Sequence, residues 1–189
     1  MDTFNNIISR RSVRGFLVDK IISDENLNKI VDAGMYAPLA VNKVLWHFTV
    51  LKDKEMQQKI IDGIIDVLKI NPTEHIKKRL SMPNFSPFYG APAVIVVSGD
   101  KKNNWAQSNC GAAIQNMLLM ANELGIDSCW VGMGNKFLNS DEAREIRNTI
   151  GVPKDYEVVG CVALGYRNTP EVPMPDKHFS ERDSIVNIF

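Results

Sequence analysis

The chain has 189 residues, 44% of them hydrophobic, which is enough apolar material for the core of one domain. Lys plus Arg and Asp plus Glu both number 22, so no net charge attracts nucleic acid or an anionic membrane surface. Three cysteines without a CxxC spacing and three scattered histidines argue against a disulfide framework and a metal site. A polar N-terminal stretch and the lack of a membrane-length apolar run predict a cytoplasmic protein.

The first half of the chain is predicted to be mainly helical. A short helix near the N-terminus has Asp2 or Thr3 as its N-cap. Residues 23–38 and 53–72 repeat apolar side chains at helical spacing, so each predicts an amphipathic helix. The alternating residues 47–52 between them predict a strand.

The segment from 71 to 90 has a different character, with three prolines and a group of aromatic residues. We expect an irregular loop here, and loops of this length within a compact domain are usually functional or mobile. Phe85, Phe88 and Tyr89 are candidates for the wall of a substrate pocket. Anchoring of the loop in the core explains them equally well.

The second half mixes strands and helices without a strict βαβ order, which predicts an α+β fold. Strands are expected over 92–99, 128–134 and 156–166, and helices over 104–125 and 139–153. The first half of the helix over 104–125 carries small side chains. They allow another backbone to approach closely, either in the core or across a dimer interface.

Three arginines and a serine lie within five positions just after the first predicted helix, in RRSVRGF (residues 10–16). Basic side chains in a last helical turn complement the helix macrodipole, which is one interpretation of Arg10, Arg11 and Arg14. The other is phosphate binding, because a guanidinium offers a rigid fork of donors and Ser12 adds a hydroxyl. The cluster alone favours neither interpretation over the other.

Two glycines in VGMGNKF (residues 131–137) follow a predicted strand but do not form a dinucleotide fingerprint. That fingerprint needs a third glycine opening a helix at once, whereas Phe137 occupies its place and the next helix is expected only near Ser140. Glycines at a strand end still expose backbone N–H groups to a ligand. No nucleophile set, P-loop or EF-hand is present, so an enzyme of this sequence would depend on a bound cofactor.

Five stretches together resemble the nitroreductase family of FMN-dependent oxidoreductases. In chain order they are RRSVRGF, APLAVNKVLWHF, YGAPAVIVV, LGIDSCWVG and LGYR, and they extend the resemblance over nearly the whole chain. Three departures stand out within them. Leu39 occupies a position where the family often has serine, Val44 and Leu45 replace its Gln-Pro pair, and Arg167 replaces a common proline.

The resemblance implies one FMN-binding domain over residues 1–189, with a central mostly antiparallel sheet flanked by helices. It also implies an intertwined homodimer with FMN at the subunit interface. NAD(P)H would reduce the flavin at N5, and a nitroaromatic or quinone would then be reduced in a ping-pong mechanism. The alternatives are other flavin chemistry on the same fold, such as dehalogenation or oxidation, and a non-catalytic FMN-binding or regulatory protein.

The same resemblance implies which residues would contact FMN. The phosphate and ribityl end would be held by Arg10, Arg11, Ser12 and Arg14, with positive charge added by Arg167 and Lys177. The partner subunit would contribute Pro38, Leu39, Ala40 and Asn42. The isoalloxazine would be lined by Trp130, Val131, Gly132 and Met133. No side chain is expected to act as a catalytic acid or base, because the flavin carries the chemistry.

Overall fold

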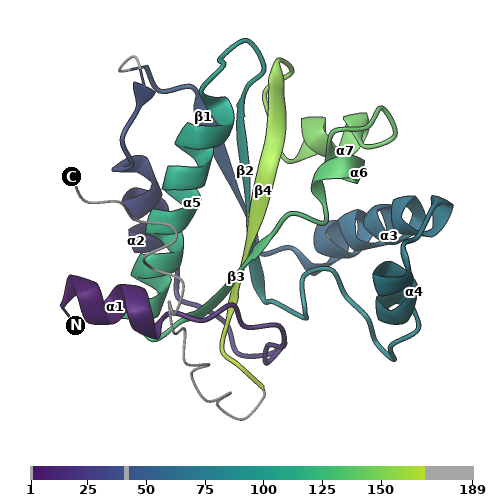
Figure 1. Cartoon of the computed structure of the whole chain (residues 1–189), viewed down its shortest axis with the longest axis horizontal. Coiled ribbons are helices and arrows are strands. Elements are labelled where there is room, and N and C mark those ends of the chain that lie inside the picture. Colours follow the sequence, from purple (N-terminus) through teal and green to yellow (C-terminus); the bar gives the residue numbers. More distant parts are fainter. Residues whose placement is uncertain (1, 41–42, 169–189) are drawn as a thin grey trace, which may run out of the picture.

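A four-stranded antiparallel sheet forms the centre of the molecule in a computed structural model that describes residues 2–40 and 43–168 (Figure 1). Its strand order is β1-β2-β4-β3, and every neighbouring pair is antiparallel. The strands are β1 Trp46–Leu51, β2 Ala93–Asp100, β3 Asp127–Val131 and β4 Tyr156–Gly165. The predicted α+β class and its four strands are confirmed.

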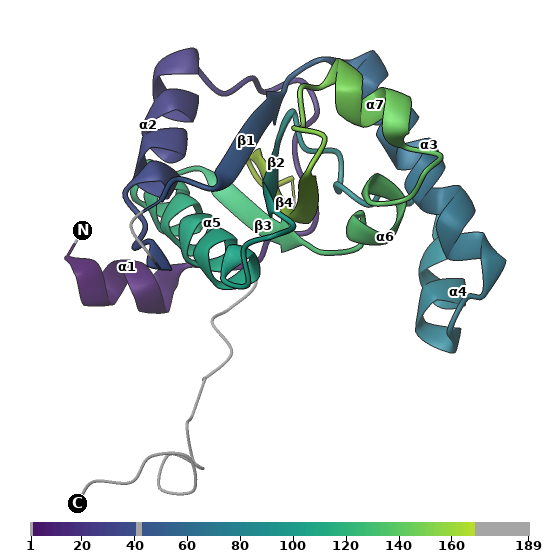
Figure 2. The same ribbon diagram turned by 90° about the horizontal axis from the view of Figure 1, so that it is seen from above.

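Helices cover both faces of this sheet. One side carries α1 (Thr3–Ser9), α2 (Asp24–Met35) and α5 (Ala106–Glu123), as Figure 2 shows from above. The other side carries α3 (Lys54–Ile70), α4 (Glu74–Leu80), α6 (Asn135–Leu138) and α7 (Arg144–Thr149). Each face therefore has its own apolar cluster, and β2 supplies both, with every residue from 93 to 99 buried.

A side-chain N-cap begins each of the first three helices, and the choice between Asp2 and Thr3 predicted for α1 is narrowed to Asp2. Asp2 accepts the backbone N–H of Asn5 at 3.0 Å at the start of α1, and Ser23 accepts that of Asn26 at the start of α2. Such bonds satisfy N–H groups that have no partner within the helix itself. Asp53 does the same for α3.

The prediction of an irregular loop over 71–90 is wrong in its first half, because α4 forms there. Thr73 Oγ1 accepts the backbone N–H of Ile76 at 3.3 Å, and Glu74 pairs with Lys77 at 2.6 Å one turn later. This N-cap and this i,i+3 pair stabilise a helix between the flanking prolines. Residues 81–90 have no regular secondary structure.

The helix predicted over 139–153 is shorter than expected: α7 covers residues 144–149, and the non-helical residues 139–143 form a break between it and a preceding short helix, α6. The amide of Asn139 explains the break. It donates to the carbonyl of Val158 at 2.9 Å and accepts the N–H of Val158 at 2.7 Å, so it bonds to β4 instead of capping a helix. The first helix after β3 accordingly begins at Asn135 and not near Ser140.

Two glycines of the sheet leave room for α5 and for the Trp130 side chain of β3. A Cβ on Gly99 would lie 3.0 Å from Ala106 Cβ and 3.1 Å from Cys110 Sγ, and one on Gly160 would lie 2.5 Å from Trp130 Nε1. The small side chains of α5 that meet Gly99 therefore serve the core. All three cysteines are buried free thiols, as predicted, and burial raises the pKa of Cys110 and of Cys161 to about 12.

Candidate functional site

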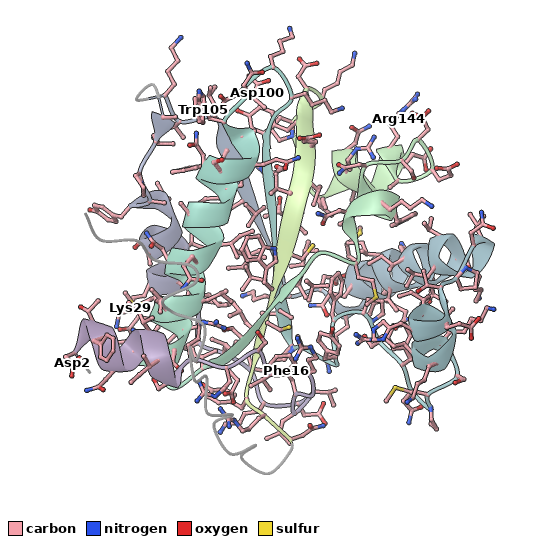
Figure 3. All side chains as sticks on the ribbon, in the orientation of Figure 1. Asp2, Phe16, Lys29, Asp100, Trp105 and Arg144 are labelled. Carbon is pink, nitrogen blue, oxygen red and sulfur yellow. The ribbon has the colours of Figure 1, made fainter. Side chains whose placement is uncertain are left out.

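The arginine-rich segment after α1 is fixed in place at both ends. Asn122 on α5 donates to the Asn6 carbonyl oxygen at 3.3 Å and to its side-chain oxygen at 2.7 Å, which holds α1 against α5. The backbone N–H of Val13 then donates to the carbonyl of Ser128 on β3 at 3.0 Å. Phe16 is 1% exposed, and its N–H donates to the carbonyl of Tyr89. Figure 3 shows Phe16 near the C-terminal end of β4.

The three arginines of this segment have different surroundings. Arg11 turns back to the end of α1, where its Nη1 donates to the carbonyls of Ile8 and Arg10 at 2.8 Å each. Arg10 Nε is buried and has no hydrogen-bond partner among the residues that the structure describes. Arg14 is exposed and lines a cavity. Arg11 thus has the geometry of helix-end compensation, while Arg10 keeps an unused donor.

The cavity beside Arg14 has a volume of about 580 Å³ and lies between the N-terminal segment, α4 and the loop after it. Among the residues that the structure describes, its walls combine cationic, aromatic and amide side chains and include no carboxylate. They are formed by Arg14, Gly15, His75, Lys78, Arg79, Met82, Pro83, Asn84, Phe85, Ser86, Tyr89 and Asn168. This combination suits a planar ligand that carries negative charge.

Two residues of the cavity wall have unusual backbone conformations. Asn84 has φ +57° and Tyr89 has φ +58°, both in the left-handed region. Asn adopts this conformation readily, but an aromatic residue does so at a cost. Gly90 continues the left-handed turn with φ +75°. Such conformations concentrate at ligand sites, because the surrounding structure must hold them in place.

Open backbone follows the C-terminal end of β3. Gly132 is exposed, and a Cβ placed on it would meet nothing within 4 Å. Met133 packs against the same apolar cluster as Tyr89. Trp130 instead lies against Gly160 on β4, so its side chain leaves the strand end uncovered. A flat ligand could therefore approach the backbone at Gly132 without displacing a side chain.

Electrostatics connects β3 with the cationic residues around it. Burial raises the pKa of the Cys129 thiol, and the positive charges of Arg14, Arg79 and Arg10 oppose that rise. One buried sulfur on β3 is thus within the field of two arginines from the N-terminal segment and one from α4. The two basic segments, more than 60 residues apart in the chain, flank the same strand.

Several residues implicated by the resemblance lie elsewhere or are already paired. Ala40 lies on the α2–α5 side of the sheet, where its N–H meets Asn109 Oδ1 at 3.3 Å, with Pro38 and Leu39 just before it. Arg167 pairs with Asp127, its Nε 3.0 Å from Oδ1. Asn42 and Lys177 lie outside the described residues.

Of the three aromatic candidates, Phe85 and Tyr89 line the cavity and Phe88 does not. Phe88 is 1% exposed and belongs to the core on the α3 side of the sheet. It anchors the loop, which was the second interpretation of this aromatic group. Its burial leaves its two neighbours to face the cavity.

The part of the wall that α4 contributes, namely His75, Lys78 and Arg79, was not predicted from the sequence. The signal was present in TEHIKKRL (residues 73–80), where a capping threonine precedes helical spacing and a basic last turn. The neighbouring prolines led us to predict an irregular loop instead of this helix. In the described part of the chain there is no group of three His, Cys, Asp or Glu side chains that could hold a metal ion, and no helix is long and apolar enough to cross a bilayer.

The protein is an α+β protein with a cavity whose described walls suit a flat, anionic ligand. Comparison with known proteins gives the family: residues 7–166 match the nitroreductase family model. A curated relative from Archaeoglobus fulgidus, provisionally named NADH dehydrogenase/NAD(P)H nitroreductase, is 35% identical over 96% of this chain and 91% of its own length. The chain belongs to the nitroreductase family.

Solved structures agree with this assignment. A nitroreductase with bound FMN from Bacteroides fragilis superposes with a TM-score of 0.87 at 31% identity, covering all of both chains. A second nitroreductase with bound FMN, from Desulfitobacterium hafniense, gives the same TM-score, identity and coverage. The predicted nitroreductase-like fold is confirmed.

Proposed function

We propose that this protein is an FMN-dependent oxidoreductase that passes electrons from NAD(P)H to a small electron-poor acceptor. The observation that carries the proposal is the buried, unpartnered Nε of Arg10 on a segment that runs beside β3. A buried donor without an acceptor is costly, and a phosphate oxygen would satisfy it. The bound FMN of the two solved relatives and the name of the archaeal relative support this assignment.

The residues present fit FMN in charge and in shape. Arg10 and Ser12 would hold the phosphate and ribityl end, and Arg14 would extend the positive charge toward the cavity. The open backbone at Gly132 and Met133 would receive the flat ring system. Arg11 and Arg167 already have partners within the chain, so this proposal does not assign either of them to the phosphate.

Bound FMN would supply two-electron transfer between NAD(P)H and a nitroaromatic or quinone, with donor and acceptor binding in turn. The side chains of this protein then have binding and orienting roles. Phe85 and Tyr89 offer flat apolar surfaces to the second substrate, and the fixed backbone after β3 orients the ring. No described side chain of the cavity is required as an acid or base.

We also propose that the protein acts as a homodimer, because apolar side chains lie uncovered on the α1–α2–α5 side. Phe4 and Ile7 of α1 are 70% and 47% exposed, and Tyr36 after α2 is 88% exposed. Exposed apolar side chains gathered on one side are typical of an interface between subunits. Pro38, Leu39 and Ala40 lie on that side, where they could reach a partner's cofactor. A reducing cytoplasm agrees with three free thiols.

The test is anaerobic reduction of the flavin-loaded protein, first with NADH and then with NADPH. We expect either donor to bleach the flavin absorbance, and a nitroaromatic or quinone added afterwards to restore it. A flavin that is retained but bleached by neither donor would contradict the oxidoreductase proposal and favour a non-catalytic FMN-binding protein. A protein that takes up no added FMN would contradict both.

A further inference from the structure

The α4 wall of the cavity carries positive charge that nothing in the described chain neutralises. Arg14, Lys78 and Arg79 face the cavity with His75 beside them, and none of its described wall residues is Asp or Glu. Neither Lys78 nor Arg79 forms an ion pair within residues 2–40 and 43–168. In a chain with 22 basic and 22 acidic residues, this local excess calls for a ligand.

Arg79 is also held in a defined orientation. Its Nη2 donates to the Tyr89 hydroxyl at 3.1 Å, and its guanidinium carbon lies 5.4 Å from the ring centres of both Phe85 and Tyr89. The left-handed backbone at Tyr89 contributes to this arrangement. Among the described residues this hydroxyl is the one acceptor that Arg79 meets, so its other N–H donors are oriented in advance for a ligand beside two aromatic rings.

Helix-end compensation does not account for these two cations. The last turn of α4 contains three basic residues, and Lys77 already forms the local pair, with Nζ 2.6 Å from Glu74 Oε1. Lys78 and Arg79 point into the cavity instead. The FMN phosphate does not require them either, because Arg10 and Ser12 lie on the segment bridged to β3 and not on the α4 wall.

We propose that the electron acceptor of this site is an aromatic molecule bearing an anionic group, such as a carboxylate or sulfonate, bound by Arg79 and Lys78. This inference rests on the proposed function and narrows its substrate class. The aromatic ring would lie against Phe85 and Tyr89, while the anionic group accepts the free N–H donors of Arg79. Arg79 and Lys78 select the substrate and take no part in electron transfer.

The experiment compares acceptors that differ in charge and little else. Reduction of 4-nitrobenzoate and of 4-nitrobenzamide is measured with NADH as donor for the wild type, for the double variant Lys78→Gln with Arg79→Gln, and for Lys77→Gln. Lys77 is the matched control, since it lies on the same helix but does not line the cavity. The readout is the ratio of kcat/KM for the benzoate to kcat/KM for the benzamide.

We expect the double variant to lower this ratio by about tenfold or more, as for the loss of a hydrogen bond to a charged group. Lys77→Gln should leave the ratio unchanged. High salt should lower the wild-type ratio toward that of the double variant. A ratio that does not move in the double variant would overturn the proposal, and so would loss of FMN from it, which would assign these cations to the cofactor.

Two further measurements distinguish an acceptor site from a donor site. If the double variant alters the preference for NADPH over NADH but not the acceptor ratio, the cations bind the 2′-phosphate of the donor and the acceptor proposal is wrong. Calorimetric titration of the oxidised, FMN-bound protein with 4-nitrobenzoate and with 4-nitrobenzamide tests charge selection without turnover. Tighter binding of 4-nitrobenzoate, lost in the double variant, would support the charge preference even if neither donor reduced the flavin.

Discussion

Two basic segments border the cavity, and the basic residues of each divide between helix stabilisation and the cavity side. Arg10, Arg11 and Arg14 lie at and after the end of α1, and Lys77, Lys78 and Arg79 form the last turn of α4. In each segment one cation serves its own helix. Arg11 bonds to the carbonyls that end α1, and Lys77 pairs with Glu74.

The remaining cations of both segments are directed away from their helices. Arg10 keeps a buried donor that has no partner in the described part of the chain, and Arg14, Lys78 and Arg79 line the cavity. Successive residues around a helix end point in different directions, so neighbours in sequence acquire different roles. A run of basic residues therefore does not have to be assigned to a single function. Under the proposals above, compensation of the helix dipole and anion binding would coexist within three to five positions.

The largest expected effect comes from removing the free cations of the first segment. Arg10→Ala combined with Arg14→Ala should weaken FMN binding about 100-fold or more, because hydrogen bonds to charged groups contribute about 1.5–3 kcal/mol each. Flavin retention after gel filtration and titration of the flavin-free protein with FMN both measure this loss. Neither residue belongs to the buried apolar clusters, so the thermal stability of the flavin-free protein should change little. Unchanged FMN affinity would contradict the phosphate role.

Most of the sheet could be predicted because its strands are marked by composition. Residues 93–99 are uniformly buried between two helical layers, as a central strand must be, and most of them are apolar. The two failures among the helices have different causes. The cap at Thr73 is a single hydroxyl among prolines, and Asn139 looks like a helix cap until β4 supplies a better hydrogen-bonding partner. The role of Asn139 depends on a long-range contact with β4, which a local sequence pattern does not contain.

The candidate site also has one part that could be predicted from the sequence and one part that could not. The arginine segment was found because its three arginines lie beside a serine and because family motifs follow it in order. The α4 wall was missed because Arg79 is recognisable as a binding residue only from its contacts with Phe85 and Tyr89. Those two residues belong to the loop after α4. Neither left-handed φ nor the direction of Arg79 can be read from composition. Composition likewise does not show that Phe88, adjacent to Tyr89, points into the core.

An intermediate effect is expected from loosening α4 without changing any charge. Thr73→Ala removes the N-cap and should cost about 1 kcal/mol of local helix stability, which corresponds to about fivefold faster hydrogen exchange of the α4 amides. Thr149→Ala is the matched control, since that hydroxyl donates to a carbonyl within α7 and caps nothing in α4. FMN affinity should stay constant, because the first segment does not depend on α4. If flavin were lost, the two segments would not be independent.

The smallest effect is expected for the cation that serves its own helix in the first segment. Arg11→Gln removes the charge at the end of α1 and the two 2.8 Å bonds to the carbonyls of Ile8 and Arg10. The loss should amount to about 0.3–1 kcal/mol of unfolding free energy, typical of a cation at a helix C-terminus. The FMN dissociation constant should change by less than about twofold, since a hydrogen bond to phosphate would contribute more.

Chemical denaturation and FMN titration of Arg11→Gln and Arg11→Lys separate the two roles of this position. The lysine variant keeps the charge and should recover most of the stability, while neither variant should release flavin. A loss of FMN affinity comparable to that of an Arg10→Ala variant would place Arg11 at the phosphate instead, as the family resemblance implies. The assignment of Arg11 to the helix end and of Arg10 and Arg14 to the ligand would then be wrong. The two basic segments would no longer be comparable.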